Sequence, residues 1–186
     1  MVVAQQMSEE AYQRFILSGV EGAWELHDGR VVEKPGMTWE HSDIVTELAY
    51  LLRRQIARSE YRVFIESRVR RPTATIFLPD VMVVPTDYGD PFRGRPSTLA
   101  IFSDPLPLIV EVWSSSTGED DVDAKLPVYQ QRGDLEIWRI HPYERTLTAW
   151  RRQPDGSYQE TIHRDGVVKP ASLPGVAIDL GAHFDD

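Results

Sequence analysis

Two carboxylates and one lysine are the residues most able to do chemistry in this chain. Asp80 follows a proline and precedes the apolar run 81–84, and Glu111 interrupts the apolar segment 106–113. An unpaired charge in a buried strand is costly, so each acid needs a partner or a function. Two carboxylates can hold a divalent metal while an ammonium, such as that of Lys125, positions an attacking water. The combination predicts a Mg²⁺-dependent phosphodiesterase site.

Each of these residues also has a purely structural interpretation. Asp80 could cap a loop or pair with an arginine, and Lys125 could form a helical ion pair with Asp121, worth about 0.2–0.5 kcal/mol. Pro127 disfavours helical geometry in the residue before it, so we expect Lys125 in a turn that leads into a helix. His41 lies on an apolar helical face, where it is either a hydrogen-bonded core residue or part of the site.

Several elements that must position these residues can be read from the first half of the chain. The spacing of apolar residues predicts a short helix over 8–18 and a long helix over 38–56. The Asp-Gly pair within 24–32 is typical of a β-hairpin. The β-rich runs 61–69 and 75–84 are predicted to be two strands, and Asp80 would lie in the second one.

The second half continues with alternating loops, strands and a helix. We expect a long proline-rich loop over 86–106 and then a central strand, covered on both faces, over 106–113. A short helix over 126–132 and a strand over 135–140 follow. A second hairpin over 146–163 and an extended segment over 173–180 close the chain. This order predicts an α/β or α+β fold with a mixed sheet and a hairpin at each end. We expect a single domain over 1–186.

Composition restricts the functional classes. The net charge of −9 argues against a protein that coats nucleic acid, although arginines concentrate in 53–71 and 93–95. The absence of cysteine excludes thiolate metal sites and fits a reducing compartment. Neither a signal peptide nor a membrane span is expected, so we expect a cytoplasmic location. Serines 114–116 lack a nucleophile elbow, and a two-carboxylate glycosidase has no specific support.

Four ordered motifs resemble one known family. They are Pro79-Asp-Val-Met-Val-Val, Pro107-Leu-Ile-Val-Glu-Val-Trp-Ser-Ser-Ser-Thr, Asp121-x-x-x-Lys-Leu-Pro-x-Tyr and Gly133-x-x-Glu-Ile-Trp. Together they are similar to the Uma-type restriction endonuclease family of the PD-(D/E)XK nuclease superfamily. The resemblance extends over nearly the whole chain, from the first hairpin to the closing segment.

The resemblance implies a restriction-endonuclease-like core, in which helices flank a mixed central sheet and the acids lie at one edge. Asp80 corresponds to the aspartate of the first half-motif and Glu111 to the acid of the second. The superfamily's simplest pattern has a lysine two residues after the second acid, where this chain has Trp113. By similarity to the family, Lys125 takes the role of that lysine.

The resemblance also implies a cofactor and a substrate. Asp80, Glu111 and the Val112 carbonyl would hold Mg²⁺, with Mn²⁺ as a substitute, and His41 or Glu40 would complete the outer shell. DNA is the expected substrate, and a homodimer is expected. Ser115, where the family has proline, and the acidic pair 119–120, where basic residues are frequent, are departures. The acidic pair favours a rival interpretation, a nuclease fold that binds nucleic acid or regulates without cutting.

Overall fold

The computed structural model describes residues 6–71, 73–115 and 118–184. A six-stranded sheet at its centre has the order β11-β10-β9-β8-β6-β3. Strands β8 and β9 are parallel, and the other neighbours are antiparallel. The strands are β3 (Tyr61–Ile65), β6 (Val81–Pro85), β8 (Leu108–Val112), β9 (Glu136–His141), β10 (Thr146–Arg152) and β11 (Tyr158–His163). This mixed sheet agrees with the expected fold class.

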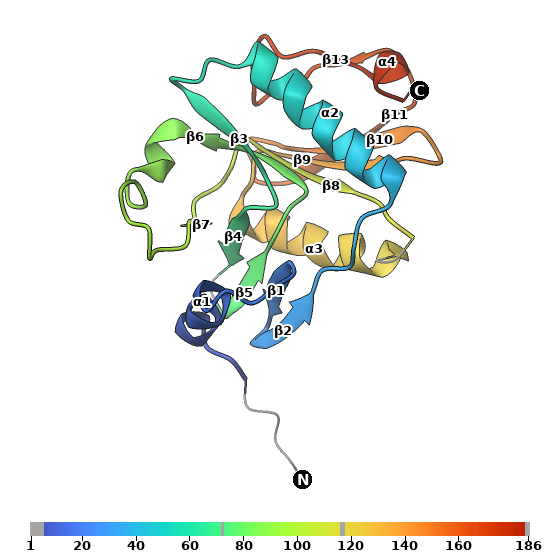
Figure 1. The fold of residues 1–186 in the computed structure, drawn as a ribbon. Helices are drawn as coiled ribbons and strands as arrows, with labels where there is room; N and C mark the ends of the chain where they lie inside the picture. Colours follow the sequence, from blue (N-terminus) through green and yellow to red (C-terminus); the bar gives the residue numbers. More distant parts are fainter. Residues whose placement is uncertain (1–5, 72, 116–117, 185–186) are drawn as a thin grey trace.

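Helices cover both faces of the sheet. The long helix α2 (Trp39–Gln55) lies across one face and α3 (Gly118–Arg132) lies against the other (Figure 1). The apolar residues of α2 share one core cluster with Val110 of β8, whereas Tyr129 of α3 shares a second cluster with Ile109. Because side chains alternate along a strand, β8 supplies residues to both clusters.

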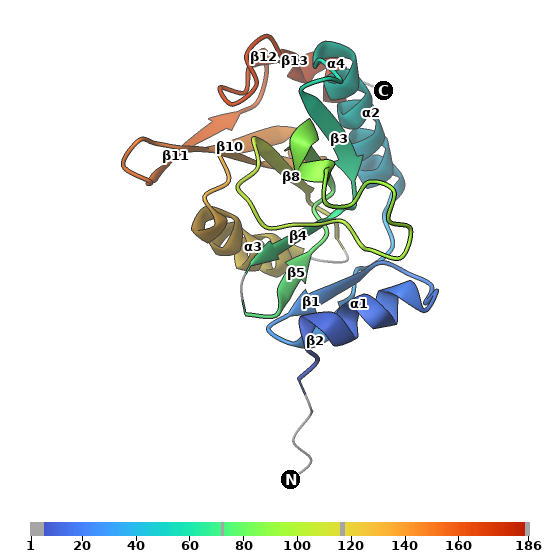
Figure 2. The ribbon, with the colours of Figure 1, turned by 90° about the vertical axis from the view of Figure 1, so that its left-hand side faces the viewer.

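A second sheet, of five strands in the order β2-β1-β5-β4-β7, lies beside the first. Its strands are β1 (Trp24–His27), β2 (Arg30–Glu33), β4 (Arg68–Arg71), β5 (Thr75–Phe77) and β7 (Ile101–Phe102). Helix α1 (Glu9–Leu17) lies against this sheet (Figure 2). Its buried Tyr12 shares a core cluster with Leu26 of β1 and Ile76 of β5. Between β1 and β2 the predicted hairpin turn is present, with positive φ values at Asp28 and Gly29.

Smaller elements complete the chain. They are the 3-10 helix η1 (Thr86–Gly89), the paired strands β12 (Val167–Val168) and β13 (Ile178–Asp179), and helix α4 (Leu180–Phe184). The proline-rich region 86–106 is therefore not a loop throughout, because it contains η1 and β7. Within the described part of the chain, no helix has the length and apolar character needed to cross a membrane.

Two predictions about strands need correction. The runs 61–69 and 75–84 each form two strands, and each run passes from one sheet to the other. The first run breaks at Glu66, whose φ of 49° is incompatible with a continuous strand. The second breaks at Pro79, whose carbonyl accepts a hydrogen bond from the Glu66 N–H. The two breaks thus lie side by side, and Asp80 lies at the point where the chain enters the central sheet.

The prediction for the region around Lys125 is also wrong. Helix α3 begins at Gly118, so Lys125 lies within it rather than in a preceding turn, and Pro127 lies inside the helix. A proline costs one helical hydrogen bond, and this cost is offset by the buried contacts that the helix makes with the sheet. The side chain of Asp121, the alternative partner considered for Lys125, lies outside the described residues.

Candidate active site

Asp80 and Glu111 face each other across the central sheet. Strands β6 and β8 are antiparallel, and their register pairs Val81 with Val110 and Met82 with Ile109. One further step in this register places Asp80 opposite Glu111. Residues directly opposite one another have Cβ atoms about 5 Å apart and project from the same face. That face is the one covered by α3, so the helix that carries Lys125 lies directly over both acids.

Asp80 is buried, at 1% exposure, and binds three groups. Oδ1 lies 2.6 Å from Nζ of Lys34, and Oδ2 lies 3.2 Å from Nε2 of His41. The Val112 N–H donates to Oδ2 at 2.7 Å. Burial on its own would raise the pKa of Asp80, but the His41 hydrogen bond and the Lys34 charge lower it well below its usual value. Asp80 is therefore held as a carboxylate.

Glu111 has a different environment. Its Oε1 accepts a hydrogen bond from the Tyr129 hydroxyl and lies 3.8 Å from Nζ of Lys125. Lys125 and Tyr129 are four residues apart on α3, so both side chains project from the same face of the helix. Complete burial raises the pKa of Glu111 to about 8; Lys125 opposes the shift and Asp80 adds to it. The carboxyl group is therefore mostly protonated at neutral pH.

A third acid, Glu25 of β1, completes the cluster from the second sheet. Its Oε1 lies 2.9 Å from Nζ of Lys125 and accepts the Leu78 N–H at 2.8 Å. Its Oε2 lies 2.8 Å from Nε2 of His27. Burial opposes ionisation of Glu25, but the His27 hydrogen bond and the Lys125 charge outweigh it and lower the pKa. Lys125 is fully buried and bridges acids of two sheets.

The charges of the buried acids and lysines of the cluster balance when Glu111 is neutral. The ionised carboxylates of Glu25 and Asp80 then match the ammonium groups of Lys125 and Lys34. Burial alone would lower the pKa of Lys34, but Asp80 and Glu111 outweigh it and raise the pKa to about 12. A balanced cluster is expected in a buried site, because a net charge there is poorly solvated.

The structure thus brings together the four side chains singled out in the sequence. Asp80, Glu111 and Lys125 are linked through the contacts above, and His41 bonds to Asp80. Val112 contributes its N–H to Asp80, and its carbonyl faces the same side, because the N–H and C=O of one strand residue point in one direction. Which of these residues act in catalysis stays a prediction.

Other neighbours of the motifs lie away from the cluster. Glu40, which was considered with His41, is exposed and accepts a hydrogen bond from Tyr143 at 3.2 Å. Trp113 stacks on His141 with a centroid distance of 4.4 Å. Trp113, at the position where the resemblance leads one to expect a lysine, therefore belongs to an aromatic cluster.

Sequence reasoning missed three members of the cluster. Glu25 is a charged residue between Trp24 and Leu26 in an arm of the predicted hairpin, which is a weak signal. Tyr129 is the last residue of the motif that begins at Asp121, four residues after Lys125, but the motif by itself predicts no role for it. Lys34 had one signal: the chain contains only three lysines, so the position of each is informative.

The available metal ligands are few. Among the residues that the structure describes, no group of three histidine, aspartate or glutamate side chains has an arrangement suited to a metal ion. The oxygen donors that the sequence motifs predict for a metal are the Asp80 and Glu111 carboxylates and the nearby Val112 carbonyl. Mg²⁺ fits such a set, because it prefers oxygen ligands and commonly uses one or two carboxylates, with water and substrate phosphate at its other positions.

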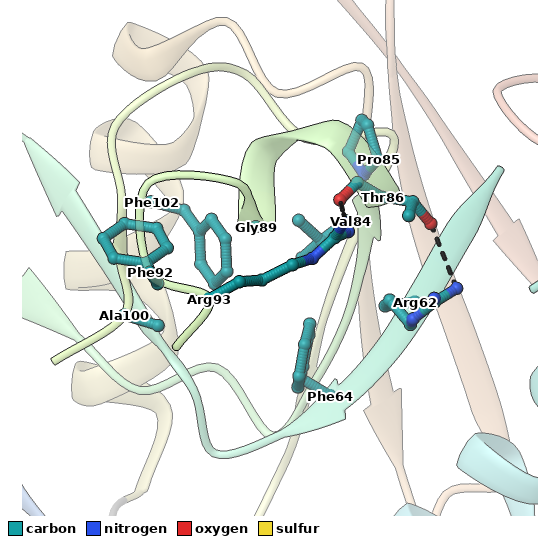
Figure 3. Close-up of a pocket in the computed structure, with 10 residues that line it drawn as sticks. All are labelled: Arg62, Phe64, Val84, Pro85, Thr86, Gly89, Phe92, Arg93, Ala100 and Phe102. Atoms are coloured by element: carbon teal, nitrogen blue, oxygen red, sulfur yellow. Dashed lines mark hydrogen bonds between the residues drawn. The ribbon is translucent and has the colours of Figure 1, made fainter. Parts of the chain in front are cut away.

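A separate pocket of about 220 Å³ lies at the other end of β6 (Figure 3). Phe64, Phe92 and Phe102 line its apolar part, and Arg62 and Arg93 border it. Both arginines donate to Thr86, Arg62 to the hydroxyl at 3.1 Å and Arg93 to the carbonyl at 2.6 Å. The pocket is also lined by Val84, which is four residues from Asp80 and therefore about 13 Å from it along the strand.

The arginine-rich segments of the sequence are divided between two places. Arg70 and Arg71 of the second sheet pair with Glu9 and Asp28, at 3.0 and 2.9 Å. Burial and the like charges of Arg58 and Arg93 lower the pKa of Arg62. Arg93 also pairs with Asp90, at 2.9 Å, so each of the two places contains paired arginines.

These features define the class of protein. A mixed sheet covered by helices, with two acids on adjacent strands and a lysine above them, is the arrangement expected of a restriction-endonuclease-like protein. The model of the family described as "Uma2: Putative restriction endonuclease" matches residues 9–181. The chain belongs to the Uma2 family.

A solved structure shows the same fold. It is a "putative nuclease belonging to DUF820" from Anabaena variabilis ATCC 29413, with a TM-score of 0.73 and 20% sequence identity. The match covers 89% of this chain and 91% of that chain. No curated protein matches the sequence at a significant level.

Proposed function

We propose that this chain is a metal-dependent endonuclease that hydrolyses phosphodiester bonds in DNA. The observation that carries the proposal is the placement of Asp80 opposite Glu111, with Lys125 of α3 at 3.8 Å from Glu111. These residues come from three separate elements, and the family's name supports the same reaction class. The core packing of β6, β8 and α3 fixes their relative positions.

Asp80 and Glu111, with the Val112 carbonyl, would hold Mg²⁺ or Mn²⁺. Such an ion polarises a phosphate and lowers the pKa of a bound water. Lys125 would orient the attacking water and stabilise negative charge on the phosphate oxygens. His41, bonded to the second oxygen of Asp80, holds this carboxylate in one orientation, and Tyr129 does the same for Glu111.

The pocket region around Arg62 and Arg93 supports DNA as the substrate, because these two arginines would contact backbone phosphates. It lies about 13 Å along β6 from Asp80, a distance that the backbone of one bound strand can span. We also expect a homodimer, because two paired sites can cut both strands of a duplex. Sedimentation velocity would test this part separately.

Cleavage of supercoiled plasmid and of single-stranded DNA with Mg²⁺ or Mn²⁺ tests the proposal. Asp80→Asn and Lys125→Ala should both abolish cutting, whereas Asp87→Asn, which changes an exposed aspartate in η1, should not. Circular dichroism would establish that each variant is folded. Cutting by Asp80→Asn at the parent rate would show that the site is assigned wrongly.

One observation favours a second candidate, a nuclease fold that binds without cutting. Lys34 and Lys125 already neutralise the acids of the cluster, which reduces the attraction for a metal ion. Pure, folded parent protein that binds DNA but cuts neither substrate would support this candidate.

A further inference from the structure

Lys34 lies in the cluster like a bound cation. Its Nζ is surrounded by three oxygens from separate segments: Oδ1 of Asp80 at 2.6 Å, the Leu78 carbonyl at 3.0 Å and Oε1 of Glu66 at 3.4 Å. The side chain is only 7% exposed. Carboxylate and carbonyl oxygens are also the ligands that Mg²⁺ and Mn²⁺ prefer. The ammonium group thus occupies an oxygen-lined cation position that includes the principal proposed metal ligand.

The use of lysine in this chain supports a special role. Only three of the 20 basic residues are lysines, and two of them, Lys34 and Lys125, lie in the cluster. The third, Lys169, is exposed. Lysine differs from arginine in carrying a compact charge on a flexible four-carbon stem. An ammonium group can therefore occupy the position of a small cation and can also leave it by rotation of the stem.

The backbone next to Lys34 gives the ammonium group room to leave. The Lys34 N–H donates to the Ala23 carbonyl at 2.7 Å, which fixes the start of the stem at the end of the first hairpin. The following residues Pro35, Gly36 and Met37 are exposed and belong to no helix or strand. Rotation of the side chain toward this segment would bring the ammonium group into water without a change in the fold.

We propose that Lys34 is a tethered cation that competes with the divalent metal for Asp80. The two compete for Oδ1, because an ammonium at hydrogen-bond distance from this oxygen repels a metal ion bound to it. The metal therefore binds only as Lys34 withdraws, and Lys34 keeps the cluster neutral until then. This inference rests on the proposed function, since it requires that Asp80 is a metal ligand.

Binding of Mn²⁺, followed by electron paramagnetic resonance without any substrate, tests the competition. Lys34→Met keeps most of the stem but removes the charge, and it should lower the Kd for Mn²⁺ by about tenfold or more, which corresponds to about 1.4 kcal/mol. Lys169→Met is the matched control and should leave the Kd unchanged. Adding Asp80→Asn to Lys34→Met should abolish the gained binding.

A second measurement uses the parent protein, in case Lys34→Met does not fold. Acetylation of lysine amines, followed by mass spectrometry, reports the accessibility of each of the three lysines. Saturating Mn²⁺ should increase the rate of Lys34 acetylation severalfold and leave that of Lys169 unchanged. A Lys34 rate that does not respond to bound Mn²⁺ would contradict the displacement.

The outcomes separate this inference from the proposed function. Equal Mn²⁺ affinity in parent and Lys34→Met, lost in both with Asp80→Asn, would overturn the role of Lys34 and leave the metal site intact. No Mn²⁺ binding by either protein would overturn both the metal site and the competition. Tighter binding by Lys34→Met without any cutting of DNA would support the competition and contradict the nuclease.

Discussion

Glu111→Gln should stabilise the protein at neutral pH, although it replaces a fully buried glutamate at the centre of the cluster. Burial holds the pKa of Glu111 at about 8, so its carboxyl group is mostly neutral at pH 7 and resembles the amide of glutamine. The Tyr129 hydroxyl can still donate to the amide oxygen. Below pH 4.5, where this carboxyl group is neutral in the folded and the unfolded chain alike, we expect a change in the free energy of unfolding within about 1 kcal/mol in metal-free buffer.

The free energy of unfolding of the parent protein should also depend on pH through Glu111. Because the folded-state pKa of Glu111 is raised from 4.5 to about 8, the folded protein binds the extra proton between these values. The stabilisation is fully present below pH 4.5 and is lost as the pH rises to about 8. A shift of this size corresponds to at most about 5 kcal/mol. Glu111→Gln should lack this loss, so it should exceed the parent in stability by about 3 kcal/mol at pH 7 and by more at pH 8.

Asp80→Asn is the matched comparison, since the same chemical change meets the opposite electrostatics. The pKa of Asp80 is lowered, so its carboxylate is charged at neutral pH and compensates Lys34. Its removal leaves a buried ammonium with weaker partners, which should cost about 3–5 kcal/mol at pH 7. The stability that Asp80 contributes should be lost only as the pH falls below 3.8.

Urea denaturation of the three proteins between pH 5 and 9, in buffer containing a chelator, would measure these differences. A single cooperative transition in the parent is also what we expect of one domain. A loss of several kcal/mol at pH 7 in Glu111→Gln, comparable with that in Asp80→Asn, would refute the reasoning, because Glu111 would then have to be ionised.

Three other predictions follow from contacts described above or elsewhere in the fold. Tyr129→Phe removes a hydroxyl bonded to Glu111 and should lower the unfolding free energy by about 1 kcal/mol, measured by urea denaturation; an unchanged midpoint would contradict it. Arg132 is buried and bonded to Asp134 at 2.9 Å, so Arg132→Met should lower the unfolding free energy by about 3–5 kcal/mol. A decrease below about 1 kcal/mol would contradict this prediction. The double variant Arg62→Ala and Arg93→Ala should weaken DNA binding and reduce the salt-dependence slope by about 2, measured by fluorescence anisotropy; an unchanged slope would exclude both arginines from phosphate contact.

The sequence by itself determined most of the local structure. The Asp28-Gly29 pair fixes the first hairpin, and apolar spacing fixes α2 with His41 on its buried face. Both signals arise from contacts within a few residues, which a sequence pattern records directly. Asp80 and Glu111 were identifiable because each interrupts an apolar run, a cost that only a partner or a function offsets.

Tertiary structure alone decided how the cluster is assembled and charged. Lys34 reaches Asp80 across 46 positions and Lys125 reaches Glu25 across 100, so no local pattern could record either pair. The passage of two runs from one sheet to the other likewise depends on the breaks at Glu66 and Pro79 lying side by side. The protonation of Glu111 depends on the complete tertiary structure, because its burial and its neighbouring charges arise only when both sheets and α3 pack together.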